Sequence, residues 1–292
     1  MARPDPLAAR IRLVVNADDC GYYPGVTRGI AEAIDAGAVT ATGVLANGTD
    51  FDAACRTLVA RPAADCGVHL NLTTGAPLSA PMLAQAARWG GRMPPGPAAL
   101  ARSLLRCELT LAAVEAEWQA QIDRVRAAGL SPRFLNTHEH VDLLPALRRL
   151  LVELARRNGI RWTRRLRPDW RSLRGLAALA RGLVVAAGSP RPDERGTRAL
   201  DCLGFGSSGR LGIDELCAIA GSIPAGATVE LMCHPGRGDD TPGASREVLR
   251  YHDWDREREA LCSARFAQRC AALGIVRVRY ADLEEGASLA PV

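Results

Sequence analysis

Two adjacent carboxylates, Asp18 and Asp19, follow a short apolar run that ends at Asn16. A Gly and a Pro come shortly afterwards and bend the chain. Asp side chains at this position could cap a following helix. Buried carboxylates are costly unless a partner neutralises them, however, and a cation is such a partner. Helix capping and cation binding are therefore the two interpretations of this pair.

Four of the five histidines lie at or near the C-terminal ends of predicted strands. His69 occurs in "CGVHLNLTTG", near Asn71, and His234 follows the apolar run of "TVELMCHPG". The segment "RFLNTHEHVDLLP" carries the remaining polar candidates, which are Asn136, His138, Glu139, His140 and Asp142. In parallel α/β folds the C-terminal ends of the strands form the active site, so this concentration predicts one shared site.

Each histidine has a simpler explanation when it is taken alone. His69 could be a hydrogen-bonded core residue, and His234 could belong to a turn. His138 and His140 alternate, so their side chains point the same way if the segment is a strand, either as a metal pair or as a polar layer. These explanations weaken when several carboxylates and imidazoles converge on one end of a fold.

One Asp and two His form a ligand set that leaves coordination positions open for water and substrate. A divalent cation in such a site lowers the pKa of its bound water and polarises a carbonyl oxygen. The neighbouring Asp can then act as general base, and His234 could protonate the leaving group. This constellation suits hydrolysis of an amide or ester through a tetrahedral oxyanion.

Alternating strand and helix patterns must position these residues, and they predict an α/β fold with a parallel sheet. The pattern fits a barrel or a doubly wound sheet, and the length and number of units favour a (β/α) barrel. The predicted strands cover 12–16, 42–46, 66–72, 134–137, 160–163, 228–232 and 275–280. The predicted helices cover about 26–36, 51–60, 111–128, 145–158, 172–187, 213–221 and 256–273.

Two Gly- and Pro-rich stretches interrupt this pattern. "RWGGRMPPGPAAL" begins at Arg88, and "GSPRPDERGTRALDCLGFGSSGR" begins at Gly188. Both are predicted loops, because Gly and Pro break regular structure. In an α/β barrel such insertions act as lids over the site or as connectors.

Composition excludes several function classes. All 37 basic residues are Arg, so the chain cannot use a phosphate-binding lysine or a Schiff base. A net charge of +5 and 4% aromatic residues argue against a nucleic-acid partner. No apolar run is long enough to span a membrane. The nine cysteines lack a C-x-x-C pair and predict buried thiols, so we expect a cytoplasmic location.

Four motifs together resemble the YdjC-type carbohydrate deacetylases, the family of chito-oligosaccharide deacetylases. They are "NADDCGYYPGVTRGI", "GVHLNLTTGAPL", "EAEWQAQIDRVRAAGLSPRFLNTHEHVDLLP" and "HPG", in the family's order over most of residues 11 to 236. The resemblance implies an α/β protein of one domain, 1–292, with a core of about 11–282 and short flexible termini. It implies a (β/α) barrel related to the polysaccharide deacetylases, which could be regular, irregular or incomplete. It also implies metal-dependent removal of an N-acetyl group from an amino sugar.

The resemblance assigns roles by position. Asp19 corresponds to the metal carboxylate and His69 and His138 to the imidazole ligands. Asp18 corresponds to the general base and His234 to the general acid. An Arg after "GIRWT", either Arg164 or Arg165, corresponds to the family arginine and could keep Asp18 ionised. The residues expected to bind substrate or to support the ligands are His140, Asn71, Arg164, Arg165 and Asp142.

The chain also departs from the family pattern. Asn136 replaces an Asp, Asp142 replaces the last His, and Cys20 stands where Phe is usual. The family is described with magnesium, whereas two imidazoles suit zinc, so one divalent ion of either kind is expected.

Alternative functions stay open at this point. The chain could hydrolyse the amide of a glycolipid or of a non-sugar compound, or be a non-catalytic barrel that binds metal or sugar. The segment "RWTRRLRPDWR" from Arg161 could grip an anionic part of the substrate or be a solvated loop. The expected partner is an acetamido sugar or oligosaccharide, and the sequence leaves the oligomeric state open, a homodimer included.

Overall fold

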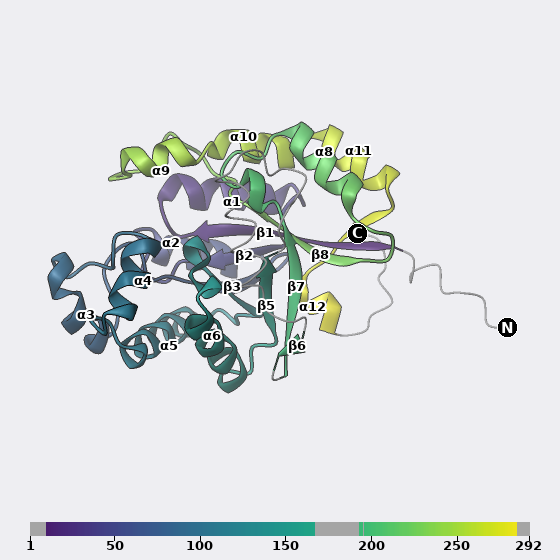
Figure 1. The fold of residues 1–292 in the computed structure, drawn as a ribbon. Coiled ribbons are helices and arrows are strands. Elements are labelled where there is room, and N and C mark those ends of the chain that lie inside the picture. Colours follow the sequence, from purple (N-terminus) through teal and green to yellow (C-terminus); the bar gives the residue numbers. More distant parts are fainter. Residues whose placement is uncertain (1–9, 167–192, 195, 285–292) are drawn as a thin grey trace, which may run out of the picture.

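The computed structural model describes residues 10–166, 193–194 and 196–284 of the 292-residue chain (Figure 1). The predicted helix at 172–187 and the arginines of the Arg161 segment beyond residue 166 lie outside these residues.

Seven parallel strands close into a barrel in the order β1-β2-β3-β4-β5-β7-β8, and β1 pairs with both β2 and β8. They are β1 (Ile11–Cys20), β2 (Ala41–Val44), β3 (Asp65–Leu70), β4 (Phe134–Thr137), β5 (Trp162–Leu166), β7 (Thr197–Leu203) and β8 (Thr228–Cys233). This closure confirms the predicted α/β barrel over the doubly wound sheet. Two further strands extend the sheet: β9 (Ile275–Arg277) runs parallel to β1, and β6 (Asp193–Glu194) runs antiparallel to β7.

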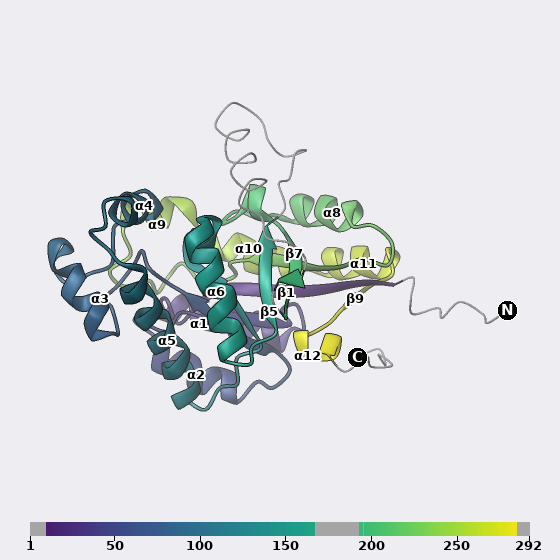
Figure 2. The same ribbon diagram turned by 60° about the horizontal axis from the view of Figure 1, so that its bottom comes forward.

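Helices surround the barrel, as Figures 1 and 2 show. The α-helices are α1 (Pro24–Asp35), α2 (Phe51–Val59), α3 (Ala80–Gln85), α4 (Pro97–Leu105), α5 (Leu111–Ala127), α6 (Pro145–Arg157), α8 (Ile213–Ser222), α9 (Arg246–Tyr251), α10 (Trp254–Leu261), α11 (Ala264–Ala272) and α12 (Tyr280–Glu284). Three 3₁₀ helices are η1 (Ala86–Trp89), η2 (His138–Leu143) and η3 (Phe205–Ser207). Helices α3, α4 and α9 gather at the end of the barrel toward which β1 runs. Within the described ranges, no helix combines the length and the apolar character that crossing a membrane requires.

The apolar strand runs in the sequence reflect burial on both faces of the sheet. Every residue of β1 except Arg12 is buried, because the barrel interior covers one face and the helices cover the other. One buried cluster draws on five barrel strands and includes Tyr280 of α12. The Tyr280 ring stacks on Phe134, with ring centroids 4.6 Å apart. Tyr280 therefore packs against the barrel strands from the C-terminal segment.

Three predicted elements were wrong. The loop predicted from Gly188 contains β7, which is flanked by Gly196 and Gly204, both with positive φ. The loop predicted from Arg88 ends early, because α4 begins at Pro97 and Pro is favourable in the first turn of a helix. The helix predicted at 256–273 is two helices, since the Ser263 side chain accepts from the Phe266 N–H and starts α11 anew.

Candidate metal centre and active site

Asp19, His69 and His138 bring three ligand atoms together at the C-terminal ends of their strands. Asp19 Oδ1 lies 2.8 Å from His138 Nδ1 and 3.2 Å from His69 Nε2, and the two nitrogens are 3.3 Å apart. Ligand atoms about 2.1 Å from one ion, at angles of about 90–110°, are about 3.0–3.4 Å apart. The spacing and the N, N, O donor set therefore fit one divalent cation.

The strand ends explain how these residues meet. His69 is the fifth residue of β3, and His138 directly follows β4, the strand paired with β3. Asp19 lies near the end of β1 with φ 67°, a left-handed conformation that is rare for residues other than glycine. Burial raises the pKa of Asp19, but His138 and His69 outweigh it and hold that pKa well below its usual value. An ionised carboxylate is thus available as a ligand.

Asn136 joins the predicted base to one of the predicted ligands. Its Oδ1 accepts from His69 Nδ1 at 2.8 Å, and its Nδ2 donates to Asp18 Oδ1 at 2.9 Å. With the His69 proton on Nδ1, the lone pair of Nε2 points at the ligand cluster. The residue that departs from the family pattern therefore holds two site residues in place.

Asp18 lies beside the cluster in an ion pair with Arg164. Arg164 Nη1 donates to Asp18 Oδ2 at 2.6 Å, and Nη2 donates to Oδ1 at 2.8 Å. Burial raises the pKa of Asp18, but the Arg164 guanidinium, together with His69 and His234, outweighs it and holds that pKa below the usual value. Of the two arginines left open by the sequence, Arg164 is the one at Asp18. Arg165 points elsewhere and pairs with Asp201.

His234 follows β8 and is buried. Its backbone N–H donates to Glu257 Oε2 at 2.5 Å, and its Nδ1 makes no hydrogen bond within the described part of the chain. The His234 ring contributes to the lowered pKa of Asp18, after the larger effects of burial, Arg164 and His69. The His234 side chain also faces Glu257, with Nδ1 3.9 Å from Glu257 Oε2.

Three other predicted residues lie outside the ligand cluster. The Asn71 side chain stabilises the loop that follows β3, because its Oδ1 accepts from the Thr73 N–H at 2.9 Å. Asp142 accepts from Thr137 and pairs with Arg148 at 3.3 Å. The His140 ring packs edge-on against Phe205, with centroids 5.1 Å apart.

His138 and His140 do not share one face of a strand, because the strand ends before them, as its predicted bounds of 134–137 indicate. β4 ends at Thr137, and the chain turns into η2 with φ values of 52° at Glu139 and 53° at His140. Asp142 and Arg148 brace this turn. Only His138 therefore reaches the ligand cluster.

The structure adds four buried or half-buried residues that the sequence analysis did not assign. Glu230 pairs with Arg164, Tyr280 donates to Glu230, Glu257 accepts from His234, and the His252 ring lies 5.1 Å from the His234 ring. Glu230 could have been found, because it is the one charged residue in the apolar run "TVELM". The other three lie far along the chain from their partners and have no local signal.

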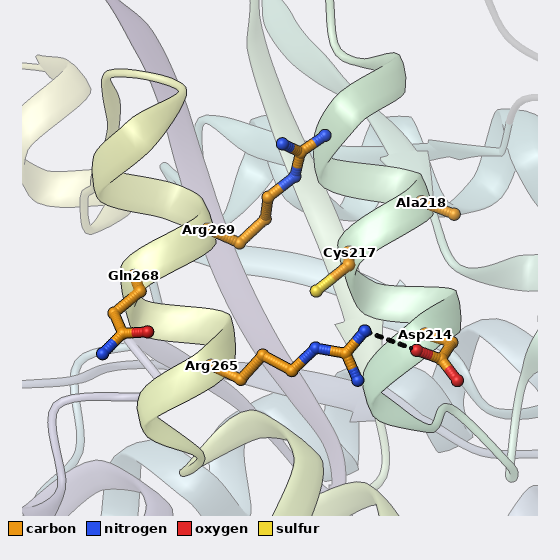
Figure 3. Close-up of a pocket in the computed structure, with 6 residues that line it drawn as sticks. All are labelled: Asp214, Cys217, Ala218, Arg265, Gln268 and Arg269. Atoms are coloured by element: carbon orange, nitrogen blue, oxygen red, sulfur yellow. Dashed lines mark hydrogen bonds and ion pairs between the residues drawn. The ribbon is translucent and has the colours of Figure 1, made fainter.

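A surface hollow between α8 and α11 contains none of these residues (Figure 3). It is lined by Asp214, Cys217, Ala218, Arg265, Gln268 and Arg269. Arg265 and Asp214 form an exposed ion pair of 2.7 Å across it, which is an ordinary surface contact. The chemistry-bearing groups are instead at the strand ends.

Comparisons with known proteins identify the family to which the chain is similar. The family model described as YdjC-like protein matches residues 12–272. A carbohydrate deacetylase from Mus musculus is 32% identical over 251 residues, covering 78% of each chain. A carbohydrate deacetylase from Homo sapiens is 31% identical over 261 residues, covering 81% of this chain and 76% of that protein. A crystal structure from Enterococcus faecalis V583, named for cellobiose-phosphate cleavage, covers 94% of this chain and 99% of its own. Its TM-score of 0.69 at 24% identity supports the barrel fold alone.

Proposed function

The chain belongs to the YdjC-like protein family, and we propose that it is a metal-dependent hydrolase that removes an N-acetyl group from an amino sugar. The relatives named carbohydrate deacetylase support the substrate class. The observation that carries the proposal is the convergence of Asp19, His69 and His138 beside the ion pair of Asp18 with Arg164.

Charge balance supports a divalent ion at Asp19, His69 and His138. Asp18, Asp19 and Glu230 carry three negative charges and Arg164 one positive charge, which leaves a formal charge of −2 with neutral imidazoles. A divalent cation would neutralise this buried excess. When bound, it would polarise an acyl oxygen and acidify water, and Mg²⁺ and Zn²⁺ are both candidates.

Asp18 is the proposed general base. A carboxylate offers about four lone-pair positions. Three described N–H groups occupy Asp18, two from Arg164 and one from Asn136. One position on Oδ2 therefore stays available to accept a proton from the attacking water. The lowered pKa keeps this carboxylate ionised at neutral pH.

His234 is the proposed general acid. Its Nδ1 is free of hydrogen bonds within the described residues, and Glu257 fixes the backbone of the same residue. A protonated imidazole can donate to the nitrogen of the departing amine. In this proposal His234 would act as the acid, and Asp18 as the base, on the same scissile amide.

Two variants test the proposal when metal content and acetate release are measured on the same samples. Asp18→Asn should keep the cation, because Asp18 is not a ligand, and should lose turnover. His69→Ala should lose both. The substrates are a panel of N-acetylated amino sugars, a glycolipid and a non-sugar amide. Wild-type turnover in Asp18→Asn would refute the base assignment, and release from the non-sugar amide alone would refute the substrate class.

A further inference from the structure

The Arg164 guanidinium is held along two edges by two carboxylates. Nη1 and Nη2 donate to Asp18, while Nε and Nη2 donate to Glu230 Oε1 at 2.9 and 2.5 Å. All three side chains are 4% exposed or less. Four of the five guanidinium N–H groups thus have carboxylate acceptors, and the guanidinium plane is fixed from both sides.

Glu230 is itself fixed by neutral donors. Asn16 Nδ2 donates to Glu230 Oε1, and the Tyr280 hydroxyl donates to Oε2, both at 2.9 Å. Burial, and after it the charge of Glu230, raise the pKa of Tyr280 well above its usual value. The hydroxyl therefore keeps its proton and acts only as donor here.

These contacts form a chain from the C-terminal helix to the proposed base. Tyr280 of α12 contacts Glu230 of β8, Glu230 contacts Arg164 of β5, and Arg164 contacts Asp18 of β1. An arginine side chain has several rotatable bonds, so a single carboxylate partner leaves its guanidinium free to tilt. A second carboxylate on the other edge removes that freedom.

We propose that Glu230, held by Tyr280, is a positioning residue that fixes the plane of the Arg164 guanidinium and, through it, the carboxylate of Asp18. The expected effect of Glu230 on turnover rests on the proposed hydrolase function. The expected effect of Glu230 on the orientation of Arg164 does not. Helix α12 is thereby part of the active-site support, although none of its described residues belongs to the ligand cluster or is the proposed acid or base.

Crystal structures of the wild type, Glu230→Gln and Tyr280→Phe test the structural part without any substrate. In Glu230→Gln we expect the Arg164 guanidinium to rotate and its two-bond contact with Asp18 to be lost. In Tyr280→Phe, which removes one hydroxyl, we expect a smaller displacement of Glu230 and Arg164. Both variants retaining the wild-type contact of Arg164 with Asp18 would overturn the proposal.

Kinetics test the catalytic part. We expect kcat to fall about 10- to 100-fold in Glu230→Gln and about tenfold in Tyr280→Phe, with KM and cation affinity unchanged. Thr40→Val is the matched control, because it removes a buried hydroxyl that accepts from the Val15 N–H but does not reach Arg164. If Tyr280→Phe and Thr40→Val lost the same kcat at equal melting temperature, the positioning role would be refuted. Glu230 and Tyr280 would then contribute only to stability. A wild type without acetate release would refute the proposed function, and the crystal structures would still decide the positioning role.

Discussion

At the scale of single residues, Asn136 combines an acceptor for His69 with a donor for Asp18. Its amide accepts from His69 and donates to Asp18, so it serves an imidazole and a carboxylate at once. An aspartate would place a second negative charge 2.9 Å from Asp18 Oδ1. The amide thus supports the ligand and the proposed base without competing for charge.

Replacing Asn136 with Ala should weaken cation binding about 10- to 100-fold, because the His69 ring loses the acceptor that fixes its orientation. Isothermal titration with Zn²⁺ or Mn²⁺ measures this. Asn158→Ala is the control: Asn158 also makes several side-chain hydrogen bonds, but at the end of α6. Unchanged affinity in Asn136→Ala would show that the hydrogen bond to His69 does not matter for binding.

At the scale of elements, α1 supports the loop that carries His234. Gly25 and Gly29 are four residues apart, on one face of α1. A Cβ at Gly29 would lie 2.3 Å from Gly236 Cα, and a Cβ at Gly25 would lie 2.2 Å from the Arg237 carbonyl oxygen. The backbone of the His234 loop thus packs directly on the helix backbone.

Gly29→Ala should therefore displace the loop two residues after His234 and reduce kcat by up to about 100-fold, while cation binding is retained. Gly221→Ala in α8 is the control, since its added Cβ meets only the flexible end of the Arg269 side chain. Acetate release and cation titration on both variants give the comparison. Equal kcat in the two variants would mean that α1 does not position His234.

The sequence predicted the strands whose apolar runs are buried on both faces of the sheet. It also indicated that the polar residues at the ends of these strands lie together. It did not predict β7, because glycines on both sides resemble a loop and its residues alternate in burial. It could not predict the turn at Glu139 and His140, because a left-handed backbone at these residues depends on tertiary support from Asp142 and Arg148. The Tyr280–Glu230 contact joins positions 50 residues apart and has no local signature.

At the scale of the whole molecule, barrel closure brings Asp19 to within hydrogen-bond distance of His138, 119 residues away along the chain. Closure also gathers Asp18, Asp19, Glu230 and Arg164 in one part of the interior. Their formal charge of −2, counted with neutral imidazoles, is unfavourable there without a partner. We therefore expect folding and cation binding to be coupled, because the barrel builds the ligand set and a bound divalent cation would balance its charge.

The most direct measurement is an anomalous difference map from crystals of the full chain soaked in Mn²⁺ or Zn²⁺. We predict one strong peak within bonding distance of Asp19 Oδ1, His69 Nε2 and His138 Nδ1, and no peak at that position in crystals of His69→Ala. A wild-type map without a peak there, or with the ion bound by other residues, would contradict the account.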